Sequence, residues 1–519
     1  MSSSPNRIGG GLSPPRDARP IIAGERIHVV GAAGAGASAA ALLAARAGAI
    51  VSACDASGPS PYTVALEAMG VAIELGHSAT HVSEQPRPER LAVTKALTAI
   101  DPDNAELVEA RRVGIPLESW QQVVADAAVG RTLVGVAGTH GKSTSAGWLV
   151  HVLTSAGADP SAFVGALLPS YITNGPPATA RWGRGTAFVV EADEYAGNFD
   201  PYRPDVAILT TVDWDHPDVF ADRPAVIDAF EIWLRRAPAG ATLVANVADE
   251  GVAAVVEGLG DWPGSVIAYA LVDQATQRLG GYARAMADRF GAGEGRATTL
   301  LGRVTALDQA STTLEVHGLD PIAGPISVRL ITAGRHNAAN ALGVAGAANA
   351  LGLGTAEIAR GLASFAGVGR RLERKGEAAG VTVYDDYGHH PTAIRATLAA
   401  VRQREPGRRI WVAFEPLTFH RTAAMLGALA EALAGADRVA IADVWAGRDP
   451  DTTIASPAGL ARAIAARRPE IPVLAPGSVE ATADRLASEV RGGDVVLVMG
   501  GGRSYRIGEL LLERLGGRE

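Results

Sequence analysis

The sequence predicts an α/β protein of three domains with mainly parallel sheets, and three observations support this. Strand-like apolar runs alternate with alanine-rich helical runs along almost the whole chain. Two of the strand-like runs end in a glycine-rich turn that opens a helix, which is how a parallel sheet presents a helix N-terminus to an anion. At 519 residues the chain is longer than one hydrophobic core supports, so we expect about three domains.

Composition excludes several classes of protein. The chain carries 47 basic and 55 acidic residues, a net charge of −8, and no long basic stripe, which argues against a nucleic-acid partner. Its single cysteine, Cys54, excludes an intramolecular disulfide and a zinc cluster made of cysteines, and we interpret it as a small buried hydrophobe. No run of eighteen uncharged apolar residues occurs, so we expect no membrane span.

The N-terminal segment, residues 1–22, contains several Ser, Pro, Gly and Arg residues and no apolar stretch of the kind found in signal peptides. We therefore predict a disordered tail there and a cytoplasmic location for the protein.

The first domain is predicted over residues 23–129. A strand over 26–30 runs into the turn Gly31-Ala-Ala-Gly-Ala-Gly36, and a helix follows from Ser38 to about residue 47. The next strand, residues 49–54, ends at Asp55, where an acidic side chain can bond a ribose hydroxyl. The glycine spacing is not that of a dinucleotide-binding turn. A purely structural turn without a ligand is the alternative interpretation.

The second domain is predicted over residues 130–332 and opens with a phosphate-binding loop. An apolar run breaks at Gly138-Thr-His-Gly-Lys-Ser-Thr144, and Lys142 is one of only three lysines in the chain. Such a loop needs a compact ammonium for phosphate, and Ser143 then lies where Mg²⁺ takes an oxygen ligand. Val136 stands where the strict Walker pattern has glycine. The pattern predicts a nucleotide-triphosphate site, and an ordinary strand-to-helix turn is the alternative.

Two further strands of this domain deliver polar groups at their carboxyl ends. Residues 186–190 lead into Glu191-Ala-Asp-Glu-Tyr195, and residues 205–212 lead into Asp213-Trp-Asp-His-Pro217. Doubly wound sheets bind ligands at this edge. The alternatives are a salt-bridged strand end for Glu191 and a capping or packing role for His216.

The third domain is predicted over residues 333–519. It begins with Ala333-Gly-Arg-His-Asn337, which opens an alanine-rich helix, and it contains the block Val383-Tyr-Asp-Asp-Tyr-Gly-His-His-Pro391. Strands are expected over 409–414 and 494–499, followed by Gly500-Gly-Gly-Arg503 and a last helix. No internal repeat occurs in the chain.

In order along residues 26–500, these blocks resemble the Mur ligases of peptidoglycan synthesis. The resemblance rests on the glycine-rich opening turn and on the blocks Gly-Thr-His-Gly-Lys-Ser, Glu-Ala-Asp-Glu, Asp-His, Gly-Arg-His-Asn-x-x-Asn, Arg-Arg-Leu-Glu and Asp-Asp-Tyr-Gly-His-His-Pro. It implies a three-domain Mur ligase-like architecture, with a Rossmann-like N-terminal domain that binds a UDP-sugar, a central P-loop ATPase domain and a Rossmann-like C-terminal ligase domain.

The resemblance also implies a reaction. Members use ATP to phosphorylate a substrate carboxylate, and an amine then attacks the acyl phosphate to give an amide, ADP and phosphate. The chain is most similar to the branch that adds L-alanine to UDP-N-acetylmuramate. ATP, Mg²⁺ and these two small molecules are the implied cofactors and partners, and the protein is expected to be a monomer or a homodimer.

The resemblance assigns roles to particular residues. It implies that Lys142, Glu191, His216, His389 and Arg421 are catalytic and that Ser143, Glu191 and His216 bind metal. The implied ATP-binding residues are Gly138, Thr139, His140, Gly141, Lys142, Ser143, Thr144, His336, Asn337, Asn340, Arg371 and Asp386. The implied UDP-sugar residues are Gly31, Gly34, Gly36, Ser38 and Asp55. The implied amino-acid-binding residues are Tyr387, His389, His390 and Arg421, although the His-His-Pro segment is also compatible with a strand end and helix cap.

Several positions depart from the alanine-adding branch. Leu417 stands where a histidine is usual, and His420 could compensate only if the loop is rebuilt. Arg503 replaces an acidic residue, Ala33 and Ala37 replace Gly and Met, and about 273–302 is a longer segment than the family needs. These departures leave the amino acid or peptide that is added open.

The sequence leaves three alternative functions to be considered. A murein-peptide recycling ligase shares several blocks and has Glu-Pro at the position of Glu415-Pro416. A paralogue that binds nucleotide or UDP-sugar without ligating is kept open by Leu417 and Arg503. An unrelated P-loop kinase would not need the histidine and asparagine blocks of the third domain.

Overall fold

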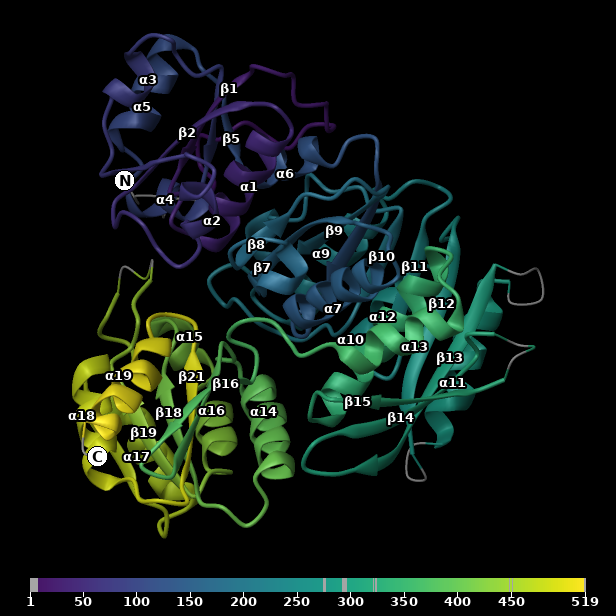
Figure 1. The fold of residues 1–519 in the computed structure, drawn as a ribbon, viewed down its shortest axis with the longest axis vertical. Coiled ribbons are helices and arrows are strands. Elements are labelled where there is room, and N and C mark those ends of the chain that lie inside the picture. The colour runs from purple at the N-terminus through teal and green to yellow at the C-terminus, as the bar shows by residue number, and fades with distance from the viewer. Residues whose placement is uncertain are drawn as a thin grey trace.

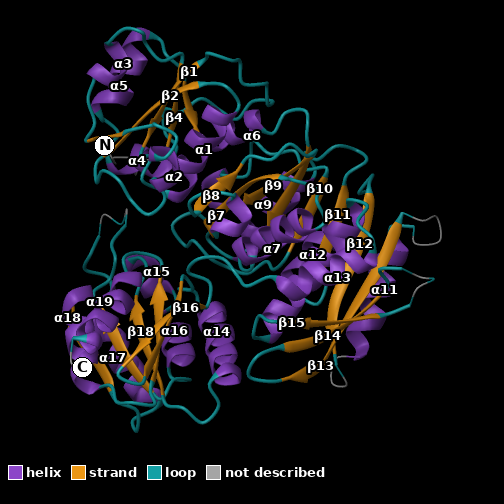
Figure 2. Cartoon of the chain, in the orientation of Figure 1, coloured by secondary structure: helices purple, strands orange, loops and turns teal. Residues whose placement is uncertain are grey.

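The structure is a computed structural model that describes residues 8–273, 277–291, 296–320, 322, 324–447, 449 and 451–517. Three sheets with flanking helices lie one after another along the chain (Figures 1 and 2). Most neighbouring strands are parallel, which confirms the predicted α/β class. In the described part of the chain, no helix combines the length and apolar character that crossing a bilayer requires.

The first sheet has five parallel strands in the order β3-β2-β1-β4-β5. Its order reverses between β1 and β4, and ligands of such sheets bind at that point. The strands are β1 (Arg26–Val30), β2 (Ile50–Asp55), β3 (Ile73–Leu75), β4 (Arg90–Val93) and β5 (Leu117–Ser119). The helices are α1 (Ala35–Arg46), α2 (Val64–Glu67), α3 (Thr80–Ser83), α4 (Lys95–Ile100), α5 (Ala105–Val113) and α6 (Trp120–Ala127).

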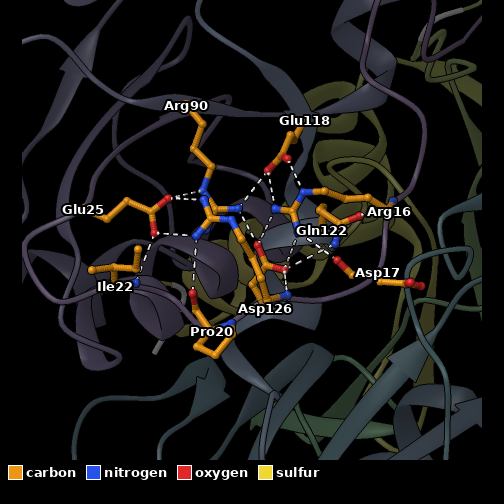
Figure 3. Close-up of polar contacts among 10 residues, drawn as sticks. Arg16, Asp17, Pro20, Ile22, Glu25, Arg90, Glu118, Gln122 and Asp126 are labelled. Atoms are coloured by element: carbon orange, nitrogen blue, oxygen red, sulfur yellow. Dashed lines mark hydrogen bonds and ion pairs between the residues drawn. The ribbon is translucent and has the colours of Figure 1, made fainter.

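The segment before β1 differs from the prediction of a disordered tail over residues 1–22. Arg16 Nε lies 2.8 Å from Glu118 Oε1, and Arg16 Nη2 lies 2.7 Å from Asp126 Oδ2 (Figure 3). Buried Arg90 also contacts Asp126 and Glu118. Buried carboxylates need cationic partners, so Arg16 ties the described part of this segment to the first domain. Residues 1–7 lie outside the described residues.

The second sheet has ten strands in the order β15-β14-β13-β12-β11-β10-β6-β9-β7-β8, antiparallel only at β7–β8, β13–β14 and β14–β15. The strands are β6 (Thr132–Ala137), β7 (Ser161–Leu168), β8 (Ala178–Arg181), β9 (Ala187–Ala192), β10 (Val206–Leu209), β11 (Thr242–Asn246), β12 (Ser265–Val272), β13 (Ala297–Leu307), β14 (Thr312–His317) and β15 (Ile326–Leu330). The helices up to β15 are α7 (Lys142–Ser155), α8 (Ser170–Thr173), the 3₁₀ turn η1 (Tyr195–Gly197), α9 (Arg223–Leu234), α10 (Glu250–Gly258) and α11 (Gln277–Arg289).

The long segment predicted at about 273–302 belongs to the second sheet and its helices. Its helix α11 packs on β12 and β13. Residues 274–276 and 292–295 of the segment lie outside the described residues.

The helices α12 (Arg335–Ala350) and α13 (Thr355–Ser364) follow β15 and pack on the second sheet. Ala338, Leu342 and Ile358 belong to the same apolar cluster as Leu149 of α7. This packing favours a boundary between the second and third domains after α13, whereas the sequence pattern places it at residue 333. The block at residues 333–337 opens α12, as expected, but this helix belongs to the second sheet's domain, which its sequence alone does not reveal.

The third sheet has the order β16-β17-β21-β18-β19-β20, and only β16 is antiparallel to its neighbour. The strands are β16 (Glu373–Ala378), β17 (Val381–Asp386), β18 (Ile410–Glu415), β19 (Arg438–Ala442), β20 (Val473–Gly477) and β21 (Val495–Gly500). The helices are α14 (Pro391–Arg404), α15 (Phe419–Ala424), α16 (Leu426–Leu433), α17 (Pro457–Arg467), α18 (Val479–Glu489) and α19 (Tyr505–Gly516).

Candidate active site

A cavity of about 660 Å³ is lined by residues from three units, each of which consists of one sheet and its flanking helices. Gly36 and Trp120 come from the first, Lys142 and Glu191 from the second, and Arg421 from the third. The other predicted site residues that line it are Thr139, His140, Gly141, Ser143, Thr144, His216, His336, Asn337, Asn340, Arg371, Asp386, Tyr387, His389 and His390. Residues that are far apart in the sequence therefore line one cavity.

The phosphate-binding loop joins β6 to α7 in a conformation that requires glycine. Gly141 has φ +83°, and a Cβ there would lie 2.6 Å from Asn340 Oδ1. Gly138 has φ +130° and does not line the cavity, and a Cβ there would lie 2.3 Å from Thr210 Oγ1. The amides of Thr139 and His140 donate to Thr211, while the N-terminus of α7 that follows Gly141 is positioned to approach an anion closely.

Lys142 is held by two carboxylates that follow β9. Its Nζ lies 2.8 Å from Glu194 Oε2 and 3.3 Å from Asp193 Oδ1. Burial lowers the pKa of Lys142, but the two negative charges outweigh burial and raise that pKa above its usual range. Burial raises the pKa of Glu194 to about 7. Lys142 therefore remains a cation in the cavity.

Oxygen ligands for a metal surround the start of α7. Ser143 Oγ donates a hydrogen bond to Glu191 Oε1 at 2.9 Å, and Arg371 Nη2 donates to Ser143 Oγ at 2.8 Å. The amide of Gly165 holds the other oxygen, Glu191 Oε2, at 2.6 Å. A hydroxyl and an oriented carboxylate are the donor types that Mg²⁺ prefers.

A second group of donors lies beside the first. Asp193, Glu194 and His216 place ligand atoms within 4.8 Å of one another. His216 has φ +55°, and its Nε2 lies 3.9 Å from Glu194 Oε1. Burial lowers the pKa of His216. These residues fit the second ion that the resemblance implies.

Arg421 of the third unit joins the central one. Its Nε lies 2.7 Å from Asp215 Oδ1, and both side chains are buried. Its Nη2 lies 3.0 Å from His216 Nδ1. Burial raises the pKa of Asp215, but His216 and Arg421 outweigh burial and hold that pKa well below its usual range. In this structure Arg421 is paired with a protein carboxylate, while its predicted pairing with a substrate carboxylate stays a prediction.

The two neighbouring histidines have different surroundings. His390 caps α14, since its Nδ1 accepts the amide of Thr392 at 3.2 Å. Its ring lies 4.6 Å from the ring of His140. His389 donates through Nδ1 to Tyr387 O at 3.0 Å. Burial lowers the pKa of both His389 and His390. The capping alternative is realised for His390, which also lines the cavity, whereas His389 is not a cap.

Most of the predicted UDP-sugar residues do not line the cavity. Gly31 and Gly34 lie in the turn before α1, and Asp55, at the end of β2, accepts the amide of Ala33 through Oδ2 at 3.0 Å. Ser38 is buried, 3.2 Å from Thr179 Oγ1 of the second unit. Their role in binding a UDP-sugar stays a prediction.

Of the two departures Leu417 and Arg503 from the alanine-adding branch, one lines the cavity and the other lies outside it. Leu417 lines the cavity. His420 does not line it and pairs with Asp449 through Nδ1 at 3.1 Å, so it does not replace the missing histidine. Arg503 lies outside and pairs with Glu480 at 3.3 Å. Arg503 thus has no direct effect on the cavity.

The sequence reasoning missed several cavity residues. Asp193, Glu194 and Asp215 lie inside blocks that it recognised, but nothing in those blocks shows that these acids partner Lys142 and Arg421. Gln121 was missed as well, and its Nε2 donates to Asn198 Oδ1 at 2.6 Å between the first and second units. The only sequence signal for these acidic cavity residues is that they follow the end of a strand.

Comparison with known proteins agrees with this arrangement. Three family models match the chain: "Mur ligase family, catalytic domain" at residues 26–132, "Mur ligase middle domain" at 136–348 and "Mur ligase, glutamate ligase domain" at 370–502. The chain is 38% identical to the UDP-N-acetylmuramate–L-alanine ligase of Mycobacterium sp. (strain JLS), over 95% of this chain and 96% of that protein.

Two solved structures show the same fold. One is the UDP-N-acetylmuramate-alanine ligase of Thermotoga maritima, with a TM-score of 0.74 and 22% identity over 95% of this chain and 100% of that one. The other is a murein peptide ligase of Psychrobacter arcticus, with a TM-score of 0.69 and 24% identity over 95% and 99%. On its sequence and its fold, this chain belongs to the Mur ligase family.

Proposed function

We propose that this protein uses ATP to join L-alanine to the carboxylate of UDP-N-acetylmuramate through an acyl phosphate, in peptidoglycan synthesis. One observation carries the proposal: the phosphate-binding loop, the acidic metal donors and the arginine and histidine side chains of the third unit line a single cavity. The relative that is 38% identical over nearly its whole length is named for this reaction.

The phosphate side of the cavity suits the first step. The ATP phosphates would lie on the amides of Gly141 and the N-terminus of α7, with Lys142 and Arg371 as cations beside them. Ser143 and Glu191 would hold Mg²⁺, which would neutralise charge that develops on the transferred phosphoryl group. The carboxylate oxygen attacks the γ-phosphorus, and ADP leaves. Phosphate is then a good leaving group from the acyl carbon.

The amine side suits the second step. L-alanine must lose an ammonium proton before its nitrogen attacks the acyl carbon. His389 lines the cavity, and burial holds its pKa well below 6.5, so a neutral imidazole is available to take that proton. Leu417 lines the same side and offers an apolar contact for a methyl group.

The test is phosphate release from ATP and Mg²⁺ with UDP-N-acetylmuramate, in separate reactions with L-alanine, glycine, L-serine or a murein tripeptide. The proposal predicts release that requires both the UDP-sugar and L-alanine, with an amide product by mass spectrometry. Release that depends on the tripeptide would assign the chain to recycling. Silence in all reactions would indicate a binding paralogue and contradict the proposal.

Leu417→His gives a sharper test of the amine side, because it restores the residue that is usual in the alanine-adding branch. We expect this variant to keep phosphate release and to change only the apparent KM for L-alanine. A change in the KM for ATP alone would place Leu417 away from the amine.

The location in the cell and the oligomeric state are further proposals. We propose that the protein acts in the cytoplasm, where ATP and UDP-sugars are available, as a monomer or a homodimer. Size-exclusion chromatography with light scattering distinguishes the two states.

A further inference from the structure

A cluster of metal-binding side chains lies in the first domain, outside the cavity. His28 lies on β1, Cys54 on β2, His81 on α3 and Glu106 on α5. Figure 1 shows α3 and α5 together at the end of this domain. One ligand atom from each side chain lies within 4.8 Å of the other three. His28, Cys54 and Glu106 are buried, and His81 is nearly so.

Both imidazoles are oriented as metal ligands usually are. His81 Nε2 lies 2.9 Å from Glu74 Oε2, while its Nδ1 contacts Glu106. His28 Nδ1 lies 2.8 Å from Ser52 Oγ. Its Nε2 makes no hydrogen bond of normal geometry with any described residue. In each ring an outer partner fixes one nitrogen, and the other nitrogen faces the centre of the cluster.

The charges in the cluster call for a cation. Glu74 and Glu106 lie on opposite sides of His81, and an ionised carboxylate only accepts hydrogen bonds. Glu106 is fully buried and also faces His28 and His77. Cys54 Sγ donates to both oxygens of Glu106, at 3.1 and 3.2 Å, and a divalent metal at the centre would replace these hydrogen bonds and supply positive charge to the buried carboxylate.

The ligand types indicate which metal the cluster would bind. Zinc bonds of about 2.0–2.3 Å in a tetrahedron place neighbouring ligand atoms about 3.3–3.8 Å apart. His28 Nε2 lies 3.4 Å from Glu106 Oε1, within that range. Cys54 Sγ, at 3.1 Å, and His81 Nδ1 lie closer to the same oxygen and would have to move away from it when a metal binds. Two imidazoles, one thiolate and one carboxylate suit Zn²⁺ better than Mg²⁺ or Ca²⁺.

We propose that His28, Cys54, His81 and Glu106 form a structural Zn²⁺ site that fixes the turn of the first domain. Cys54 O accepts the amides of Gly31 and Ala32, both at 3.0 Å. A metal on Cys54 Sγ therefore holds the strand end on which this turn rests. The proposal replaces the sequence-based interpretation of Cys54 as an inert hydrophobe, and it is independent of the proposed ligase activity.

Cobalt substitution tests the site in the intact protein. Cys54 is the only cysteine of the chain, so a thiolate-to-Co²⁺ charge-transfer band reports this cluster alone. Carboxylates and histidines of the cavity would bind Co²⁺ without that band. We expect one equivalent of Co²⁺ to give the band together with tetrahedral d–d absorption, and Zn²⁺ to remove both. Cobalt binding without the charge-transfer band, or no binding, would overturn the proposal.

A pair of histidine variants adds a second test. His81→Asn keeps the thiol and should weaken Zn²⁺ binding more than about 100-fold, since loss of an outer partner alone costs about 10–100-fold. His317→Asn, on an exposed strand far along the chain, is the control and should bind Zn²⁺ like the parent protein. Zinc should raise the melting temperature of the parent and control proteins but not that of His81→Asn. Equal zinc affinity in all three proteins would contradict the proposal, and if His81→Asn does not fold, the cobalt spectrum of the parent protein decides.

Discussion

Two turns in this molecule have the same local design and different surroundings. Each follows a parallel strand, opens a helix and contains a glycine in the left-handed region: Gly31 between β1 and α1 has φ +84°, and Gly141 between β6 and α7 has φ +83°. At the first turn Gly36 packs closely on Trp120, since a Cβ there would lie 2.2 Å from that ring, and both residues border the cavity without bringing a charge to it. At the second turn, Lys142 and Ser143 enter the cavity.

The difference comes from neighbouring strands. β9 supplies Glu191 and the following Glu194 to the second turn, where they bond Ser143 and Lys142. β2 supplies Asp55 to the first turn, where it bonds only backbone amides among the described hydrogen bonds. A glycine pattern thus specifies a turn, while the charges delivered beside it decide which chemistry the turn can perform.

The largest expected effect comes from removing the positive charge of Lys142, which lies at the second turn. Lys142→Ala should lower kcat for phosphate release by about 10³-fold or more, because the phosphoryl group loses the cation beside it. The fold should persist, as circular dichroism can show. Lys375→Ala is the matched control, since Lys375 pairs with Glu373 outside the cavity. Full activity in Lys142→Ala would contradict the assignment of phosphate chemistry to the second turn.

A smaller effect is expected at the backbone of the second turn. Gly141→Ala forces an alanine to φ +83° and places its Cβ 2.6 Å from Asn340 Oδ1. Calorimetry should show ATP binding weakened about 100-fold. Gly240→Ala is the control, because no heavy atom lies within 4 Å of that Cβ. Unchanged ATP affinity in Gly141→Ala would mean that phosphate does not bind on this loop.

The counterpart at the first turn is Gly36→Ala. Contact with Trp120 should cost about 1–3 kcal/mol of stability and weaken UDP-sugar binding, with ATP affinity unchanged. Gly240→Ala serves as the control here too, since no heavy atom would lie within 4 Å of its Cβ. Denaturant unfolding and separate titrations with the two nucleotides measure these effects. An equal loss of ATP affinity would show that the two turns do not act separately.

The smallest effect is a pH dependence of stability. Burial lowers the pKa of His336 to about 4, whereas an unfolded histidine titrates near 6.5. Below pH 6.5 the unfolded chain binds a proton that the folded chain refuses until about pH 4, so stability falls as the pH drops through that window. His336 contributes up to about 1.4 kcal/mol per pH unit. Urea unfolding of the parent and of His336→Gln at pH 5.5 and 7.5 checks this, and an identical difference in both would contradict it.

Local patterns in the sequence predicted the fold class and most of the cavity. The glycines, Lys142 and the blocks at the strand ends are read from short segments, and parallel strands carry their carboxyl ends to one edge. His336 and Arg421 were assigned by resemblance, and the structure brings both to the cavity.

What sequence could not predict depends on contacts between distant segments. Arg16 lies in a polar segment, and nothing local shows that it meets Asp126 more than a hundred residues away. The helix α12 follows the apparent domain boundary and packs back on the earlier sheet. The cluster around Glu106 comes from four separate elements, so no spacing motif marks it. In each case tertiary packing decides the outcome.

The most direct test of the account follows oxygen from the carboxylate of UDP-N-acetylmuramate. The sugar is labelled with ¹⁸O in that carboxylate, and the reaction is run with ATP, Mg²⁺ and L-alanine. The account predicts that one ¹⁸O atom appears in each inorganic phosphate released and that the other remains in the amide product. Phosphate that contains no ¹⁸O would show that the cavity hydrolyses ATP without activating the carboxylate, and it would contradict the ligase mechanism.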